Sequence, residues 1–213
     1  MPKYIFMTGA PGSKWSSVCK NIYYSSDIDR GDYSDARTYY HGASGTVDLM
    51  HLGAYFDPSM EFGDWFTELD QHSKAMCEAE FDRPWAGHSA GGIRIIKSHV
   101  FAAQIDFIRS TWPDCPLILV HRTNDACLGW WVRCGHFNIT YPRYDYYGDL
   151  NQMAWHIDYQ NSAILDAAAR EGVDFDVADN RHLCQRLGIT PPTTHWQQYN
   201  KSDIRVAVLG QHL

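Results

Sequence analysis

The sequence predicts an α/β fold, a three-layer sandwich with a mainly parallel central sheet. Two observations lead to this prediction. Short apolar runs with the length of buried strands recur at residues 4–7, 93–96 and 117–120, and a fourth short strand is expected at 173–177. The segments between them carry apolar residues at helical spacing. Strands that alternate with helices form mainly parallel sheets with helices on both faces.

Composition limits the class of protein. A chain of 213 residues is long enough for one domain with a substantial core, so residues 1–213 are taken as a single domain. No membrane span or secretory signal is visible in the sequence, which predicts a cytoplasmic protein. The six cysteines lack the spacing of a metal site, so no bound metal is expected. The net charge of −7 and the absence of a Lys/Arg stripe disfavour nucleic-acid binding. An anionic ligand must then be held by a local cluster of cations.

The first element is a strand, glycine loop and helix within residues 4–17. The apolar run at 4–7 breaks at Gly9, Pro11 and Gly12, and a helical pattern resumes with Val18 and Ile22. Such a turn directs backbone N–H groups toward an anion at the start of a helix. Further donors are expected from the side chains of Ser13, Lys14, Ser16 and Ser17.

The order of residues in this loop favours a site for an anion over a site for a nucleotide with magnesium. A nucleoside-triphosphate loop needs a glycine before its lysine and a Ser or Thr after it. Here Ser13 precedes Lys14 and Trp15 follows it. The remaining alternative is that the glycines form only a tight connection between strand and helix.

Residues 25–61 form a long excursion rich in Asp, Tyr, Ser and Gly, without a sustained period. Its aromatic side chains argue against disorder, since disordered segments contain few of them. We interpret it, over residues 27–61 in particular, as a candidate acceptor-binding segment, because long loops in compact domains are often functional. A surface loop packed on the core is the alternative.

The middle of the chain predicts two helices around the second strand. An amphipathic helix is expected at 64–80, with Trp65, Phe66, Leu69 and Met76 on its apolar face. The strand at 93–96 continues into Lys97, Ser98 and His99, and a helix is expected from about 101 to 110.

The third strand, at 117–120, ends at His121 and Arg122, and one of residues 123–125 caps a helix that runs to Val132. A tyrosine-rich loop is expected at 140–149. The longest helix is predicted at 150–170, and Asp179 and Gly188 bound a last helix. The expected inward residues of the long helix are Met153, Ile157, Ile164, Leu165 and Ala168.

Polar clusters follow three of the predicted strands, at 12–17, 97–99 and 121–125. Ligands in such sheets bind at the carboxyl ends of the strands, so these clusters are expected to face one crevice. Lys14, Lys97 and Arg122 would supply positive charge, and His99 is a candidate base near neutral pH. The third strand ends in His121-Arg122 where a nucleotide hydrolase places an aspartate for its metal, which predicts metal-independent chemistry.

Three segments together resemble the cytosolic-type sulfotransferases. Residues 94–99, Arg-Ile-Ile-Lys-Ser-His, resemble the strand that runs into Lys-Thr-His in that family. Residues 11–16 look like its 5′-phosphosulfate loop. Residues 119–131 look like its 3′-phosphate segment, with Arg122, Asp125 and the pair Trp130-Trp131 at matching places. The resemblance implies a P-loop-like sulfotransferase architecture and transfer of a sulfuryl group from 3′-phosphoadenosine 5′-phosphosulfate to an acceptor hydroxyl.

The resemblance also implies roles for individual residues. His99 would be the general base, and Lys14 with Lys97 would stabilise the sulfuryl oxygens and the departing phosphate. Trp15 either stacks on the adenine or packs its own helix. The 3′-phosphate would lie near Arg122. The acceptor is expected to be a carbohydrate or another hydroxylated small molecule, with no nucleic-acid or membrane partner. The donor-binding residues carried over are Pro11, Gly12, Ser13, Lys14, Trp15, Ser16, Ser17, Arg122, Cys127 and Gly129.

The chain departs from the family in three places. The family lysine follows the proline directly, whereas here Gly12 follows Pro11 and the lysine is Lys14. Gly129 stands where the family has a serine, and Thr123, Asn124 or Cys127 are the candidates to replace it. The late Arg-Lys-Gly stretch is absent, leaving Lys201 and Arg205. Two alternatives therefore stay open: a P-loop nucleotide or small-molecule kinase, and a non-catalytic nucleotide-binding module.

Overall fold

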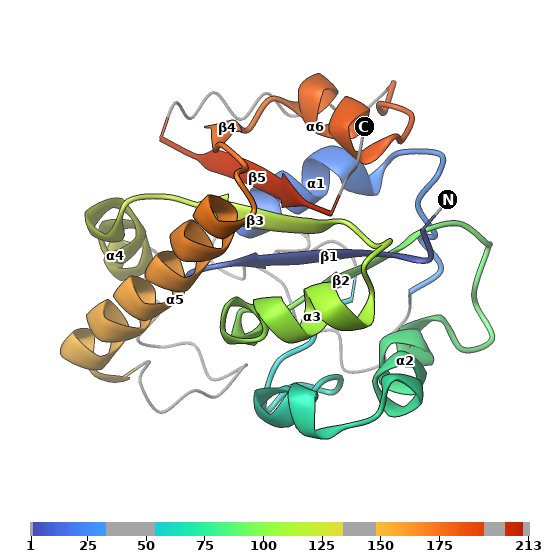
Figure 1. The fold of residues 1–213 in the computed structure, drawn as a ribbon, viewed down its shortest axis with the longest axis horizontal. Coiled ribbons are helices and arrows are strands. Elements are labelled where there is room, and N and C mark those ends of the chain that lie inside the picture. The colour runs from blue at the N-terminus through green and yellow to red at the C-terminus, as the bar shows by residue number, and fades with distance from the viewer. Residues whose placement is uncertain (1, 33–53, 134–147, 194–202, 211–213) are drawn as a thin grey trace.

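A computed structural model describes residues 2–32, 54–133, 148–193 and 203–210 of the chain. These residues form an α/β fold around one five-stranded sheet with the order β2-β1-β3-β5-β4 (Figure 1). The general prediction of an α/β protein is confirmed. The strands are β1 Tyr4–Gly9, β2 Arg94–Lys97, β3 Leu117–His121, β4 Asp176–Val177 and β5 Arg205–Leu209.

The sheet is mixed, which corrects the prediction of a mainly parallel one. β1 runs parallel to both β2 and β3, while β5 is antiparallel to both β3 and β4. β5 was not predicted, although residues 206–209 are a short apolar run like the others. The strand expected at 173–177 shrinks to the two exposed residues of β4, which pair with Val206 and Arg205 of β5.

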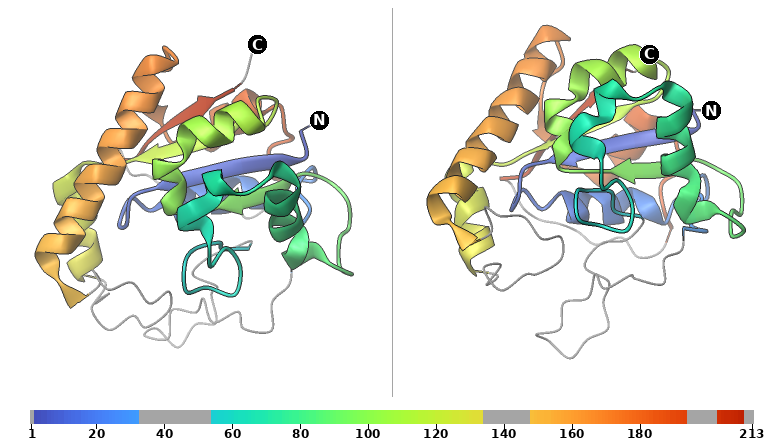
Figure 2. Two further views of the ribbon diagram at one scale, coloured as in Figure 1. Left: turned by 60° about the horizontal axis from the view of Figure 1, so that its bottom comes forward. Right: turned by 90° about the horizontal axis from the view of Figure 1, so that it is seen from below.

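Helices cover both faces of the sheet because successive strand residues point to opposite sides. Ile5 and Met7 lie in a cluster with α1 (Trp15–Tyr23) and α6 (Asn180–Leu187). Tyr4 and Phe6 lie in the opposite cluster with α2 (Lys74–Asp82), α3 (Ile105–Thr111) and the second half of α5 (Leu150–Arg170). Figure 2 shows α2, α3 and α5 on this second side.

Two predicted helices are each divided. Residues 64–80 form the 3₁₀ helix η1 (Phe66–Gln71) and then α2, because the Ser73 hydroxyl accepts a hydrogen bond from the Met76 amide and begins a new helix. Met76 is exposed, so its inward placement was wrong. The helix expected at 101–110 is also divided, into η3 (Val100–Ala103) and α3, without a capping side chain at Gln104. A further 3₁₀ turn, η2 (Arg83–Trp85), follows α2.

The later helices agree closely with the predictions. α4 spans Asn124–Arg133, and α5 begins after Asp149, whose carboxylate accepts hydrogen bonds from the amides of Asn151 and Gln152. α6 is capped by Asp179 and ends at Gly188, whose φ of 65° is left-handed. Leu165 of α5 is exposed, against its predicted inward position. Most of the loop expected at 140–149 lies outside the described residues. Among the helices of the described ranges, none has both the length and the apolar character needed to span a membrane.

The excursion at 25–61 lies in part outside the described residues, but its two described ends belong to the core. Ile28 forms a parallel bridge with Ile93, and Tyr55 forms one with Lys97. The Phe56 amide also donates to the Lys97 carbonyl at 3.1 Å. These ends therefore lie along β2 and the residue before it through single bridges, which corrects the picture of a surface loop for this part.

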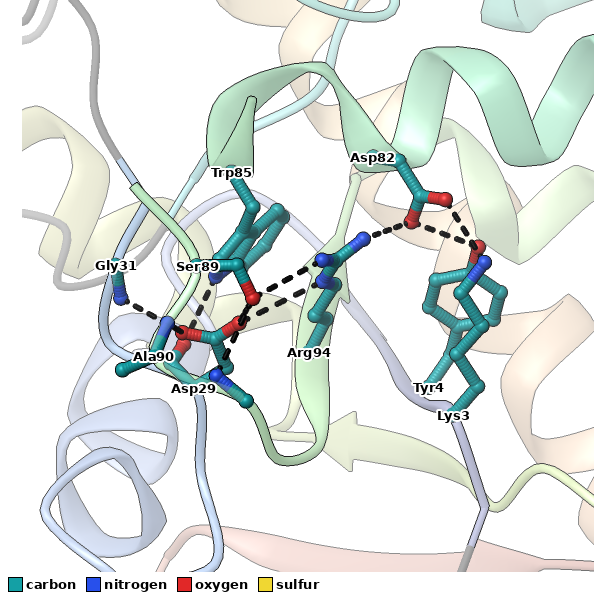
Figure 3. A network of polar contacts seen from close by, with 10 residues as sticks. Lys3, Tyr4, Asp29, Gly31, Asp82, Trp85, Ser89, Ala90 and Arg94 are labelled. Carbon is teal, nitrogen blue, oxygen red and sulfur yellow. Dashed lines mark hydrogen bonds and ion pairs between the residues drawn. The ribbon is translucent and has the colours of Figure 1, made fainter. Parts of the chain in front are cut away.

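A polar network joins the amino ends of β1 and β2 (Figure 3). The buried Asp29 carboxylate accepts hydrogen bonds from the Gly31 and Ala90 amides and from the Ser89 hydroxyl. Arg94 lies between Asp29 and Asp82, and pairs with both. Because this network lies at the edge opposite to the strand ends predicted to bind the ligand, it stabilises the sheet without occupying that edge.

Candidate active site

The carboxyl ends of β1, β2 and β3 meet at one edge of the sheet. β1 is the middle strand of the three and is parallel to both neighbours, so the segments that follow the strands are adjacent (Figure 1). Lys14, His99 and Arg122 each contact the connection from β1 to α1 or belong to it, as described below. The three predicted clusters are therefore brought together.

The connection from β1 to α1 is a tight turn packed on α4. The Ser13 amide donates to the Ala10 carbonyl at 2.9 Å. Gly12 has a φ of 81°, and a Cβ added to it would lie 2.1 Å from the Cys127 carbonyl oxygen, so only glycine fits here. The Ser13 hydroxyl oxygen is fully buried and has no hydrogen-bond partner among the described residues. Such a group calls for an explanation, and an anion seated in the turn would supply one.

Lys14 occupies the N-cap position of α1 with a φ of 64°, a left-handed conformation that costs free energy for any residue with a Cβ. Its side chain is buried, and Nζ lies 3.7 Å from the centroid of the Trp130 ring of α4. The loop thus holds a buried cation between the start of α1 and α4. Lys14 also acts electrostatically on Asp203, which lies just before β5.

His99 follows β2 and is joined directly to the loop. Its ring nitrogen Nδ1 is hydrogen-bonded to the Gly9 carbonyl. A carbonyl oxygen only accepts, so Nδ1 carries the hydrogen, and a neutral ring then has its lone pair on Nε2. The Trp15 ring centroid lies 4.3 Å from that of His99, and the Tyr55 ring packs edge-on at 6.0 Å. These contacts fix the imidazole against the glycine turn.

The surroundings of His99 keep it neutral near physiological pH. Burial lowers the pKa of His99, and the nearby charge of Asp57 and the hydrogen bond to Gly9 only partly oppose this effect. A neutral imidazole with its lone pair on Nε2 can accept a proton. The residue is 5% exposed, so it is nearly enclosed by protein.

Lys97, at the end of β2, directs its side chain toward α1. Its fully buried Nζ is 3.9 Å from Sγ of Cys19 on α1, in the layer that also contains Met7 and Ile95. Burial raises the pKa of Cys19, so the thiol stays protonated, although the charge of Lys97 opposes this. The ammonium group of Lys97 therefore lies under α1.

Arg122 binds the loop to its neighbours through hydrogen bonds within the protein. Nη1 donates to the carbonyls of Gly12 at 3.2 Å and Ala126 at 2.8 Å, while Nε donates to Asp203 at 2.6 Å. It therefore connects the turn after β1 with the first turn of α4 and the residues just before β5. The sequence suggested a phosphate ligand at this position, and the contacts describe a residue that organises the loop.

The other two residues expected near the 3′-phosphate have different surroundings. Cys127 is fully buried, its Sγ contacts the Arg122 carbonyl at 3.3 Å, and burial raises the pKa of its thiol to about 12. Gly129 is exposed on α4, with no atom within 4 Å of an added Cβ. Asn161 of α5, which the sequence analysis missed, donates to the Arg122 carbonyl at 2.8 Å and to Asn124 at 2.7 Å.

The remaining residues of the loop divide between core and site. Trp15 is 3% exposed and belongs to the core cluster under α1, so the helix-packing alternative describes it. Pro11 is buried within the turn, and Ser16 and Ser17 are partly buried in the first turn of α1. The described contacts therefore leave the buried Ser13 hydroxyl and the cation of Lys14 as the candidates to meet an anion.

Two acidic residues of this site were missed. Asp57 is fully buried and accepts hydrogen bonds from the Ser98 hydroxyl at 2.9 Å and from the His99 amide at 3.2 Å. Asp203 pairs with Arg122, and although burial alone would raise its pKa, the hydrogen bond and charge of Arg122 hold that pKa below its usual range. A signal for Asp57 existed, because it follows the short apolar run 54–56 as the other polar clusters follow their strands.

Comparison of the chain with protein-family models, with curated proteins and with solved structures finds no match. The site contains a turn with a buried orphan hydroxyl, a strained buried lysine, and a neutral histidine bound to the same turn.

Proposed function

We propose that the protein is a sulfotransferase, which moves a sulfuryl group from 3′-phosphoadenosine 5′-phosphosulfate to the hydroxyl of a carbohydrate or another small molecule. The observation that carries the proposal is the contact between His99 and the loop after β1, through the Gly9 carbonyl and the Trp15 ring. A base held against an anion-binding turn is what transfer from an anionic donor to a hydroxyl requires.

The turn fits the 5′-phosphosulfate group. The first amides of a helix lack partners within the helix and the helix dipole favours negative charge there, so the start of α1 is suited to an anion. The buried Ser13 hydroxyl, without a partner among the described residues, supports an anionic ligand at this point. Lys14 adds a positive charge at the same position. Arg122 stabilises the turn by donating a hydrogen bond to the Gly12 carbonyl.

His99 takes the proton in the proposed reaction. Nε2 accepts the proton of the acceptor hydroxyl as the hydroxyl oxygen forms its bond to sulfur, and the bond between sulfur and the 5′-phosphate oxygen breaks. Lys14 stabilises the negative charge that grows on the departing phosphate, the kind of preorganised electrostatic contribution that is usually the largest. Lys97 contributes positive potential from under α1. The imidazolium of His99 then returns its proton to water.

The 3′-phosphate is assigned to the neighbourhood of Arg122. Its guanidinium now donates to Asp203, just before β5, as well as to two carbonyls. A phosphate near Arg122 and Lys14 would compete with the Asp203 carboxylate for the same cations.

Ligand binding is the first test. Adenosine 3′,5′-bisphosphate at about 100 times its Kd stabilises a folded protein by about 2.7 kcal/mol, which raises the Tm of a chain this long by about 5–10 °C. We expect this shift without added metal and not with ATP and Mg²⁺. The opposite pattern would favour the kinase and overturn the proposal.

Turnover is the second test. We expect release of adenosine 3′,5′-bisphosphate from the donor only when a hydroxyl acceptor from a carbohydrate and phenol panel is present. His99→Ala should lower this rate about 10²–10⁴-fold while the bisphosphate affinity stays within about twofold of the wild type. His121→Ala is the matched control, because His121 is the last residue of β3 and its ring packs on Phe175. Binding without transfer across the panel would identify a non-catalytic module.

A further inference from the structure

The segment 54–57 brings an acidic side chain to the base of the site. Tyr55 pairs with Lys97 as in a parallel sheet, and the Phe56 amide donates to the Lys97 carbonyl at 3.1 Å. The backbone of Asp57 is then held in a turn, since its amide donates to the Phe62 carbonyl at 3.1 Å and its carbonyl accepts from Met60 at 3.0 Å. Asp57 is therefore held in a turn that directly follows the bridge between Tyr55 and the end of β2.

The carboxylate of Asp57 bonds to the two residues that follow Lys97. Oδ1 accepts from the Ser98 hydroxyl and Oδ2 accepts from the backbone amide of His99. Both residues and Asp57 itself are buried, with Asp57 at 0% exposure. A carboxylate is costly to bury, and these bonds offset part of that cost. The arrangement fixes the backbone of His99 while the Gly9 carbonyl fixes its ring.

Among the described residues around His99, Asp57 is the one that brings a negative charge close to the ring. The other groups around the ring are uncharged near neutral pH: Trp15 of α1, Tyr55 beside β2 and the Gly9 carbonyl after β1. Lys97 directs its ammonium toward Cys19, on the α1 side. The charge of Asp57 opposes the effect of burial, because burial lowers the pKa of His99 and Asp57 raises it.

We infer that Asp57 is a positioning residue for His99: it fixes the backbone of the base and supplies the negative charge that stabilises the imidazolium formed when Nε2 takes a proton. The second part rests on the proposed function. Asp57 acts on His99 through the hydrogen bond to the backbone amide and, by its charge, through space.

The test compares Asp57→Asn with Ser98→Ala. The Asp57→Asn substitution keeps the volume of the side chain and removes its charge, whereas Ser98→Ala removes one hydrogen bond to Asp57 and leaves the charge. The titration of the His99 ring is followed by NMR through its C2–H signal, assigned by its loss in His99→Ala. We expect the midpoint to move to lower pH in Asp57→Asn and to stay in place in Ser98→Ala. An unchanged midpoint in Asp57→Asn would refute the inference.

Activity gives a second readout. A weaker base is deprotonated at lower pH but accepts protons less readily, so Asp57→Asn should move the acidic limb of the kcat/KM profile to lower pH and lower its plateau about tenfold. Ser98→Ala should leave the limb unchanged. A lower Tm in both variants with both limbs unchanged would indicate a structural role and overturn the inference.

The two proposals can fail separately. If the NMR midpoint moves and no sulfuryl transfer is found, the positioning of His99 stands and the proposed function fails. If transfer occurs and the midpoint does not move, the proposed function stands and the role of Asp57 fails. Should Asp57→Asn not fold, Asp57→Ser serves in its place, because it also lacks the charge.

Discussion

The conformation of Lys14 predicts an unusual effect of glycine at this position. Lys14 has a φ of 64° at the N-cap of α1, whereas residues with a Cβ lose about 1–2 kcal/mol in the left-handed region. Glycine does not carry this strain, although its greater freedom in the unfolded chain costs about 0.4–1 kcal/mol. We therefore expect Lys14→Gly to be about 1 kcal/mol more stable than Lys14→Ala. Both variants lose the contact with Trp130, so the difference isolates the backbone.

The matched control lies in the same helix. Lys20 is in the last turn of α1 with helical neighbours, where glycine is less stable than alanine by about 0.5–1 kcal/mol. The free energy of unfolding of the four variants is measured by urea denaturation. The glycine variant should be the more stable of the Lys14 pair and the less stable of the Lys20 pair. The same sign at both positions would refute the reasoning.

The functional readout of these variants should not follow their stability. Both Lys14→Gly and Lys14→Ala remove the ammonium, and a hydrogen bond to a charged group is worth about 1.5–3 kcal/mol, or about 10–100-fold in affinity. We expect both to lose adenosine 3′,5′-bisphosphate binding by this factor, measured by calorimetry, while the Lys20 variants keep it. If Lys14→Gly is more stable than Lys14→Ala but does not bind the bisphosphate, the strained backbone of Lys14 is retained for the function of the loop.

Three further predictions concern the turn, the acidic residue beside it and the network at the opposite edge. Gly12→Ala should lower the free energy of unfolding by about 3 kcal/mol or more, since its Cβ would meet the Cys127 carbonyl. Gly172 is also left-handed but lies in open space, so Gly172→Ala should lower it by only about 1 kcal/mol in the same urea assay. Asp203→Asn should strengthen bisphosphate binding up to about fivefold by calorimetry, because an exposed ion pair is worth at most about 1 kcal/mol; weaker binding would show that Asp203 supports the site instead of competing with the ligand. Burial raises the pKa values of Asp29 and Asp82, but their hydrogen bonds and Arg94 outweigh it and hold both below the usual range. Their stabilisation is thus complete above the carboxyl pKa of the unfolded chain and is lost as pH falls through the lower folded values; urea unfolding should show a smaller loss between pH 5 and about pH 3 in Asp29→Asn than in the wild type.

Elements with local signals were predictable. β1 and β3 are continuous apolar runs, and the bounds of α5 and α6 follow from Asp149, Asp179 and Gly188, which act on residues within one turn. The division at Ser73 was also a local capping signal, but the apolar residues around it suggested one continuous helix.

Elements that depend on distant partners were not predictable in the same way. The direction of β5 and its place between β3 and β4 come from pairing with strands far away in the sequence. The burial of Ile28 and Tyr55 also depends on contacts with Ile93 and with Lys97 of β2. Their own segments have no regular period, so their composition suggested a loop.

The sequence by itself determined the layered α/β class, the glycine turn after the first strand, and the choice of Lys14, His99 and Arg122 as polar residues at strand ends, because these depend on residue type and spacing over a few positions. Only the tertiary structure decided what each one contacts. It directs Lys97 under α1, engages Arg122 with Gly12 and Asp203, and brings Asp57 to His99. The physical reason is that these hydrogen bonds and buried contacts join groups that are separated by tens of residues. A local sequence pattern does not indicate which distant groups will be in contact.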